Sequence, residues 1–164
     1  MRKFLLPILL ALVPALAGCV TVDDPEQGGQ PLYFVMRHLD TPQGERDPDL
    51  LPAGQSAAAH VPDVIAARPG VIYVSTWKRT AQTAVAVATR YNPTPVTYDP
   101  ADTPALVARA RQGPWPVLIV GHSNTVPDIV EQLGGPRPAP LSHPDFGDIW
   151  RVEANGTTTK LRVR

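Results

Sequence analysis

The chain has 164 residues, a single cysteine and a formal net charge of zero at neutral pH. This balance excludes a strongly basic nucleic-acid binder, and one cysteine excludes an internal disulfide. The 20 prolines fall mainly between periodic segments, which is typical of loops in a globular fold and not of a disordered chain.

The N-terminus reads as a targeting segment. A short positive start, M-R-K, precedes the apolar stretch Phe4–Ala17, which is shorter than the roughly 20 residues of a membrane span. The stretch closes with L-A-G-C, which resembles the lipobox of bacterial lipoproteins, whose cysteine is lipidated. We therefore expect residues 1–18 to be a lipoprotein signal peptide and Cys19 to carry lipid. The alternatives are an ordinary secretory cleavage site or a buried thiol.

A chain that begins at Cys19 keeps 146 residues, with 13 basic and 15 acidic side chains. That length suits one domain. Residues 19–31 are polar and rich in glycine and proline, as in a flexible tether, and 32–164 would form the domain. The predicted location is the cell envelope, lipid-anchored and extracytoplasmic, which in a Gram-negative cell means the periplasmic or outer-membrane side.

The hydrophobic pattern alternates between strands and helices along the domain. In chain order we expect the strand Leu32–Met36, the helix Gln55–Ala67 with a kink or break at Pro62, the strand Val71–Val74, the helix Thr80–Arg90, the strand Pro95–Tyr98, the helix Pro104–Gln112, the strand Val117–Val120, the helix Thr125–Leu133, and the strands Ile149–Glu153 and Thr157–Val163 joined by a hairpin turn at Asn155-Gly156. This order predicts a three-layer α/β/α sandwich with a mostly parallel sheet and an antiparallel edge.

Cationic side chains and histidines follow three of these strands. Arg37 and His38 come directly after the first strand, Arg79 lies just beyond the second, and His122 follows the fourth. Parallel strands present their carboxyl ends on one edge of a sheet, where ligands bind. Arginine matches phosphate oxygens with planar donors, and histidine is a nucleophile near neutral pH. The pattern therefore predicts phosphoryl transfer through a histidine.

Three motifs carry a family resemblance: V-M-R-H-L-D-T, S-T-W-K-R-T-A-Q-T-A and V-G-H-S-N-T-V-P, in that order. Together they resemble the histidine phosphatase superfamily, which has the phosphoglycerate-mutase-like fold. The resemblance implies that His38 is the nucleophile, that Arg37 and Arg79 clamp the phosphate, and that His122 hydrogen-bonds the phosphoryl oxygens. It also implies a reaction without a metal or an organic cofactor.

The proton donor to the leaving group is harder to place. Some members of the family have an acid directly after the second histidine, where this chain has Ser123, and others have an acid after the third strand. Asp99 is our candidate donor, with Asp102 behind it. The alternative is that Asp99 merely begins a turn before a proline.

The residues after the first motif also need interpretation. The family commonly has glycine or alanine where this chain has Leu39, so we expect the larger side chain to narrow the pocket or shift the loop. Asp40 and Thr41 match positions that line the pocket in the family. We interpret His60 and His143 as structural or solvated.

These observations predict a phosphatase that hydrolyses phosphomonoesters, or phosphohistidine, through a covalent phosphohistidine at His38. The substrate would be a small phosphorylated molecule or a phosphorylated surface glycan, and the lipid anchor would supply the membrane contact. Two alternatives remain. One is an envelope lipoprotein that binds phosphorylated ligands without catalysis. The other is a serine esterase with Ser123 as nucleophile, because G-H-S after a strand resembles a nucleophile elbow.

Overall fold

The computed structural model describes residues 29–143 and 145–164. The predicted signal peptide, Cys19 and most of the predicted tether lie outside the described residues. Within the described part of the chain, no helix is both long enough and apolar enough to cross a membrane.

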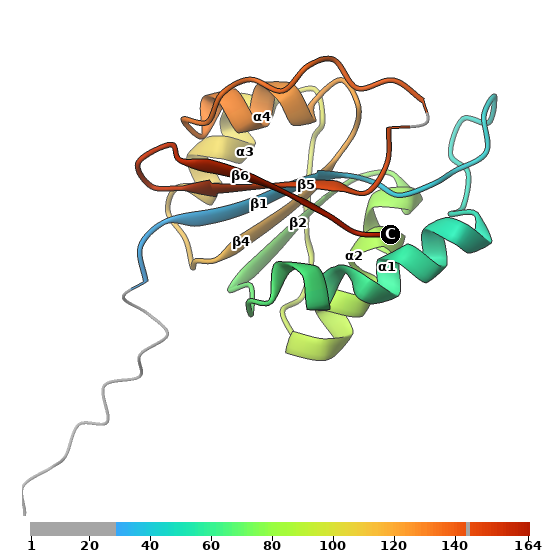
Figure 1. Ribbon diagram of the computed structural model, residues 1–164, viewed down its shortest axis with the longest axis horizontal. Coiled ribbons are helices and arrows are strands. Elements are labelled where there is room, and N and C mark those ends of the chain that lie inside the picture. Colours follow the sequence, from blue (N-terminus) through green and yellow to red (C-terminus); the bar gives the residue numbers. More distant parts are fainter. Residues whose placement is uncertain (1–28, 144) are drawn as a thin grey trace, which may run out of the picture.

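A six-stranded sheet with four helices forms the domain (Figure 1). The strands lie in the order β3-β2-β4-β1-β5-β6, and β5 and β6 are the antiparallel pair at one edge. The elements are β1 (Leu32–Arg37), α1 (Pro52–Ile65), β2 (Val71–Ser75), α2 (Lys78–Tyr91), β3 (Val96–Tyr98), α3 (Thr103–Ala110), β4 (Val117–Gly121), α4 (Val126–Gln132), β5 (Asp148–Glu153) and β6 (Thr158–Arg162).

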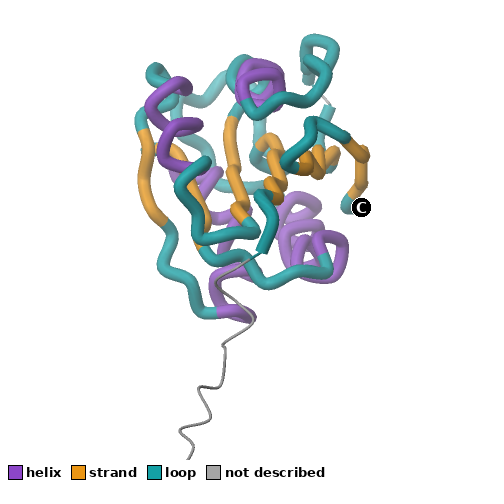
Figure 2. The backbone as a smooth tube through the Cα atoms, turned by 90° about the vertical axis from the view of Figure 1, so that its left-hand side faces the viewer, coloured by secondary structure: helices purple, strands orange, loops and turns teal. Residues whose placement is uncertain are grey.

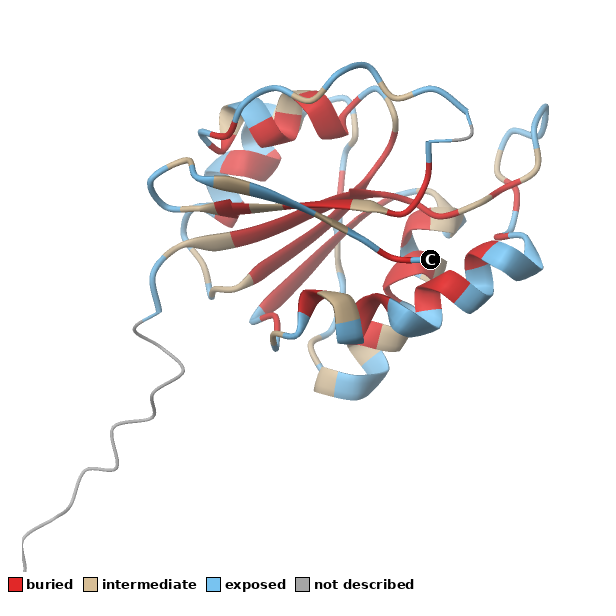
Figure 3. Ribbon diagram, viewed as in Figure 1, coloured by how far each residue is buried: buried red, intermediate tan, exposed pale blue. Residues whose placement is uncertain are grey.

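Helices cover both faces of the sheet, as Figures 1 and 2 show. The alternation of side chains along the central strands feeds two separate cores. Tyr33 and Val35 of β1 pack with α3 and α4, whereas Phe34 and Met36 pack with α1 and α2. Figure 3 shows the central strands as the buried middle layer. The predicted three-layer α/β/α sandwich with an antiparallel edge is therefore confirmed.

Strand β4 lies between β1 and β2 and is buried along its whole length, as its apolar run predicts. Each predicted element exists, and most boundaries differ from the prediction by a few residues. The predicted break at Pro62 is wrong, because α1 begins earlier, at Pro52, and continues through Pro62 to Ile65. Pro62 lies in the last turn of the helix and its ring is buried against the core, so its packing compensates for the hydrogen bond that proline cannot donate.

Candidate active site

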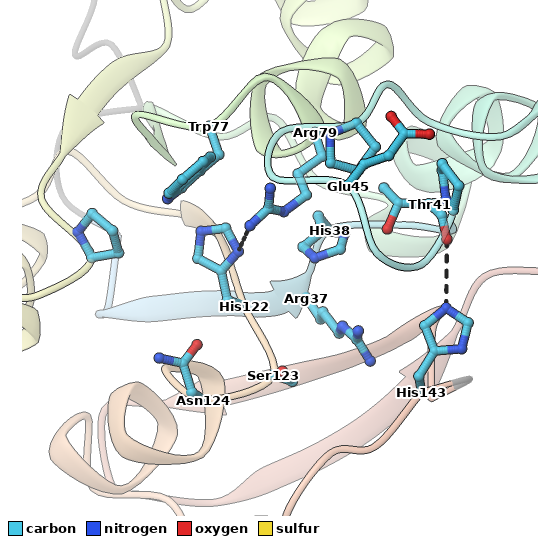
Figure 4. Close-up of a pocket in the computed structure, with 13 residues that line it drawn as sticks. Arg37, His38, Thr41, Glu45, Trp77, Arg79, His122, Ser123, Asn124 and His143 are labelled. Atoms are coloured by element: carbon cyan, nitrogen blue, oxygen red, sulfur yellow. Dashed lines mark hydrogen bonds between the residues drawn. The ribbon is translucent and has the colours of Figure 1, made fainter.

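The register of the two central strands brings the two histidines together. Arg37 is the Cα partner of Gly121 across the parallel β1–β4 pair, and the His38 amide donates to the Gly121 carbonyl at 2.9 Å. His38 and His122 therefore follow equivalent positions on neighbouring strands. Their ring centroids lie 5.4 Å apart in an edge-to-face arrangement (Figure 4).

The His38 ring is fixed by its own backbone. Its Nδ1 lies 2.9 Å from the Leu39 carbonyl oxygen, which can accept a hydrogen bond but cannot donate one. Nδ1 therefore carries the proton, and the lone pair of the neutral ring is on Nε2. The Leu39 amide in turn donates to the Thr83 hydroxyl of α2 at 3.0 Å, which holds the loop in place. The neutral ring with its lone pair on Nε2 is the form in which an imidazole attacks phosphorus.

The His122 ring contacts two polar groups. Its Nε2 lies 2.8 Å from Ser75 Oγ at the end of β2, and its Nδ1 lies 3.4 Å from Nη2 of Arg79. Because a guanidinium has no acceptor, Nδ1 must be the acceptor, and Nε2 therefore carries the proton. The residue before His122 is Gly121, where there is no room for a side chain: a Cβ there would lie 2.8 Å from Thr125 Oγ1.

Arg37 is buried beneath the cavity, with 8% of its surface exposed. Its Nη1 donates to the carbonyls of Ser142 and Asp145, at 2.7 and 3.2 Å, and its Cζ lies 4.1 Å from the centroid of the Phe146 ring. Within the described residues its Nε has no hydrogen-bond partner. A buried cation with one donor unused is suited to an anionic ligand.

Arg79 lies in the first turn of α2, on the opposite side of the histidine pair. Its guanidinium stacks on Trp77, with Cζ 4.8 Å from the ring centroid, and lies 3.6 Å from a carboxylate oxygen of Asp47. The aromatic face and the carboxylate hold the side chain at the edge of the cavity, where planar donors can meet phosphate oxygens.

These four side chains line one cavity of about 420 Å³. The structure brings the side chains of Arg37, His38, Arg79 and His122 together at this cavity, as Figure 4 shows. The cavity is also lined by Thr41, Pro42, Glu45, Pro48, Trp77, Pro100, Ser123, Asn124 and His143. Among the described residues, Glu45 is the one carboxylate in this lining.

The local electrostatics keep both histidines neutral. Burial lowers the pKa of His38 to about 3; the contact with the Leu39 carbonyl opposes this shift, and the nearby His122, Arg37 and Arg79 add to it. Burial first, and then the two guanidinium groups, lowers the pKa of His122 to about 4. Burial also lowers the pKa of both arginines. In the empty cavity the positively charged form of each of these groups is disfavoured. An anion that enters the cavity makes the charged forms more favourable.

Asp99 and Asp102 are placed elsewhere by the structure. Asp99 is exposed, does not line the cavity, and accepts a hydrogen bond from the Ala101 amide at 2.9 Å. Asp102 caps α3 by accepting from the Ala105 amide at 3.0 Å. These are turn and N-cap roles, which matches the alternative interpretation of Asp99.

The residues after the first motif divide between core and cavity. The expectation that Leu39 narrows the pocket is wrong, because its side chain is fully buried in the core with α1 and α2. Thr41 lines the cavity, as the resemblance implies, but Asp40 does not. His60 is exposed on α1 near Asp63, as expected.

His143 is exposed, as expected, and it also lines the cavity, which the sequence did not indicate. Gln43 Nε2 donates to its Nδ1 at 2.8 Å. Its Nε2 lies 3.4 Å from the Thr41 carbonyl oxygen. Sequence reasoning missed this bridge because its partners lie 100 residues apart, and it also missed Glu45, Trp77 and Asn124. The sequence did carry a signal for two of these residues: Glu45 is an acid shortly after the first motif, and Trp77 is an aromatic residue inside the second.

Ser123 lies in the cavity lining without the partners of a catalytic serine. Within the described residues, no hydrogen bond joins its hydroxyl to a histidine: the His122 ring contacts Ser75 and Arg79, and His38 Nδ1 contacts its own backbone. The geometry therefore gives Ser123 no base of the kind that activates a serine nucleophile.

Comparison with known proteins agrees with this geometry. Residues 34–101 match the sequence model of the histidine phosphatase superfamily (branch 1). Comparison with curated proteins found no significant match.

Among solved structures, the protein histidine phosphatase SixA complexed with tungstate is 19% identical, with a TM-score of 0.61, covering 80% of this chain and 96% of that one. A phosphoserine phosphatase from Entamoeba histolytica in complex with 3-phosphoglyceric acid is 14% identical, with a TM-score of 0.59 and coverages of 82% and 98%. A mycobacterial glucosyl-3-phosphoglycerate phosphatase with inorganic phosphate is 16% identical, with a TM-score of 0.56 and coverages of 83% and 96%. At these identities the likeness shows the fold.

The comparisons agree with the class of fold: the chain has the phosphoglycerate-mutase-like fold that the histidine phosphatases among these structures share. Over residues 34–101, which include the first two motifs, the chain also matches the sequence model of the histidine phosphatase superfamily (branch 1), in agreement with the resemblance.

Proposed function

We propose that the protein hydrolyses phosphomonoesters or phosphohistidine through a phosphohistidine at His38. The observation that carries this proposal is the convergence of His38, His122, Arg37 and Arg79 on one cavity. His38 Nε2 attacks the phosphorus, a P–N bond forms, and the bond to the leaving group breaks. A water molecule then attacks the phosphorus, the P–N bond breaks, and its electron pair returns to Nε2.

Charge in such a transfer lies on three equatorial phosphoryl oxygens, so the protein acts mainly by positioning and by electrostatic stabilisation. Arg37 and Arg79 approach the cavity from different elements and would hold these oxygens from two sides. The unused donor Nε of Arg37 supports this role. Residues already in place at the end of folded strands need little reorganisation during the reaction.

The site fits two classes of leaving group. A phosphomonoester releases an alkoxide, which needs a proton, and among the described residues Glu45 is the carboxylate that lines the cavity. A phosphohistidine releases an imidazole, which is a better leaving group. The name of SixA, a protein histidine phosphatase, favours testing that second class on this chain as well.

The test is a comparison of His38→Ala with Ser123→Ala, in the form that starts after Cys19, on aryl phosphates, alkyl phosphates and phosphohistidine. We expect His38→Ala to abolish turnover and Ser123→Ala to keep most of it. Wild-type protein quenched during turnover should carry an acid-labile phosphoryl group on His38. Loss of carboxylic esterase activity in Ser123→Ala would instead favour the esterase. Binding of inorganic phosphate with no turnover would favour the non-catalytic lipoprotein.

We also propose that Cys19 carries lipid and anchors the protein on the extracytoplasmic side of a membrane, with residues 20–31 as the tether. The support is the sequence L-A-G-C after the apolar stretch. Wild-type protein should fractionate with membranes and show added mass at Cys19, and Cys19→Ser should be released or left unprocessed. Fully soluble wild-type protein with no added mass would contradict the anchor and leave the catalytic proposal intact.

A further inference from the structure

Thr83 lies on α2, one turn after Arg79, and its hydroxyl group connects two parts of the candidate site. The side chain is fully buried and does not line the cavity. Its Oγ1 lies 2.8 Å from the Arg79 carbonyl oxygen and 3.0 Å from the amide nitrogen of Leu39, the residue after His38. One hydroxyl group therefore contacts both the backbone of Arg79 and the backbone beside the proposed nucleophile.

The direction of each hydrogen bond at Thr83 follows from its partners. The Arg79 carbonyl oxygen can only accept, so the hydroxyl donates its one proton to it, and the Leu39 amide donates to the hydroxyl oxygen. A threonine in a helix often donates to the carbonyl four residues earlier, so the bond to Arg79 alone would carry no functional meaning. The bond from Leu39 is different, because it reaches 44 positions back along the chain.

Leu39 in turn holds the His38 ring with its other backbone group. Its carbonyl oxygen lies 2.9 Å from His38 Nδ1, the nitrogen that carries the ring proton. The Leu39 side chain is buried among α1 and α2, and the Asp40 carbonyl accepts from the Leu51 amide at 2.8 Å. Thr83 is thus the polar side chain of α2 that secures the residue to which the His38 ring is bonded.

The orientation of this ring matters to the chemistry at its other nitrogen. As Nε2 of His38 bonds to phosphorus, positive charge develops on the ring. A carbonyl oxygen already placed at the Nδ1 proton stabilises that charge without reorganisation. The attack also requires alignment, and a misplacement of about 1 Å can cost roughly a hundredfold in rate. A rotation of the Leu39 peptide would move the carbonyl and the ring together.

We propose that Thr83 is a positioning residue that holds the His38 imidazole in line for attack, because it ties the Leu39 peptide to α2 beside the Arg79 backbone. This inference rests on the proposed function and deepens it. In the step concerned, His38 Nε2 bonds to phosphorus, the bond from phosphorus to the leaving oxygen breaks, and its electron pair stays on that oxygen. The Nδ1 proton remains on the ring, bonded to the Leu39 carbonyl.

The experiment compares Thr83→Val, which keeps the branched shape without the hydroxyl, with Thr83→Ser, which keeps the hydroxyl. The substrate is an activated aryl phosphate, whose leaving oxygen needs little protonation. In rapid-quench single turnovers, the rate of phosphoenzyme formation per folded molecule should fall about tenfold to a hundredfold in Thr83→Val and should largely recover in Thr83→Ser. The dissociation constant of inorganic phosphate should stay close to wild type in both, because the backbone of α2 still places Arg79.

Thr103→Val is the matched control. Thr103 lies at the start of α3, outside the cavity lining, and its hydroxyl accepts from Gln132 Nε2 at 3.0 Å. Its substitution removes a threonine hydrogen bond between helices and should leave the rate of transfer unchanged. Three results would overturn the proposal: a wild-type transfer rate per folded molecule in Thr83→Val, a Thr83→Ser variant as slow as Thr83→Val, or equal losses of transfer rate and phosphate affinity, which would indicate a disturbed cavity.

Nitrogen-15 NMR of labelled histidines gives a second readout. In wild type without phosphate, His38 should be protonated on Nδ1, and Thr83→Val should show a mixture of tautomers. A wild-type ring protonated on Nε2 alone would overturn the proposal, because the Leu39 carbonyl would then not hold it. Thr83→Ala removes the same hydroxyl with less bulk and serves if Thr83→Val does not fold.

The two levels of the proposal fail in different ways. If wild-type protein forms no phosphoenzyme on His38, the proposed function fails. If it forms one, and Thr83→Val forms it equally fast, this inference alone fails.

Discussion

The amide of His38 donates to the carbonyl of Gly121, the residue that precedes His122, so one backbone hydrogen bond ties the two histidines of the site to each other. The bond extends the β1–β4 ladder by one step beyond the strand ends. The pairing of β1 with β4 therefore sets the distance between the two rings. A site built on the ends of central strands is held more rigidly than one built on loops.

Arg79 should control the affinity for phosphate. Its guanidinium lies at the cavity edge, and removing a charge-assisted donor costs about 1.5 to 3 kcal/mol, which corresponds to roughly a tenfold or greater rise in the dissociation constant. We expect this rise in Arg79→Ala, measured by calorimetry with inorganic phosphate. Lys78→Ala is the control, because Lys78 pairs with Asp49 and does not line the cavity. Equal effects of the two substitutions would indicate a general charge effect and not a clamp.

The two neutral histidines should make stability depend on pH. In the folded state the pKa values of His38 and His122 are lowered to about 3 and about 4, whereas an unfolded chain has histidines near 6.5. Between these values the unfolded state binds more protons, so the free energy of unfolding should fall as pH decreases from about 6.5 towards 4.

Urea titrations at a series of pH values test this dependence. The slope between pH 6.5 and 4 should become smaller in His38→Ala than in wild type, because one of the two groups has been removed. His60→Ala is the matched control, since His60 is exposed on α1. A His38→Ala variant with the full wild-type slope would show that burial of this ring does not set the pH dependence.

Asp99 and Glu45 should differ in their effect on leaving groups. The Asp99 carboxylate accepts from the Ala101 amide, so Asp99→Asn should change turnover of alkyl and aryl phosphates by similar, small factors. Glu45 lines the cavity, so Glu45→Gln should slow alkyl phosphates more than activated aryl phosphates, whose leaving oxygens need little protonation. A selective loss on alkyl phosphates in Asp99→Asn would restore Asp99 as the proton donor.

Gly121→Ala should damage the site through packing. The added Cβ would lie 2.8 Å from Thr125 Oγ1 and 3.2 Å from the hydroxyl of Tyr98, and Thr125 Oγ1 accepts the His122 amide proton. We expect a loss of stability of about 1 to 3 kcal/mol and a clear fall in turnover. Gly29→Ala, where no atom lies within 4 Å of the added Cβ, should change neither. Wild-type turnover in Gly121→Ala would mean that the His122 backbone tolerates displacement.

The sequence was sufficient to predict the fold and the meeting of Arg37, His38, Arg79 and His122 at one cavity. Strands β1 and β4 are apolar runs with a cation or histidine at the end, and parallel order places such ends on one edge. The role of Asp99 could not be predicted, because an aspartate before a proline has the same sequence signal whether it caps a turn or donates a proton. The bond between Gln43 and His143 was also beyond prediction, since it joins two loops that meet only in the folded chain.

The same separation in sequence has a consequence for Arg37. Its Nη1 is satisfied by carbonyl groups of Ser142 and Asp145, more than 100 residues further along the chain, and Phe146 packs against its guanidinium. Residues 34–101, which match the family, contain His38 and Arg79 but not this segment. A partly folded or truncated chain would therefore carry the nucleophile without an oriented clamp. Catalysis should therefore begin only after the segment that contains Ser142, Asp145 and Phe146 has packed against Arg37. Activity would then measure how much of the protein has folded completely.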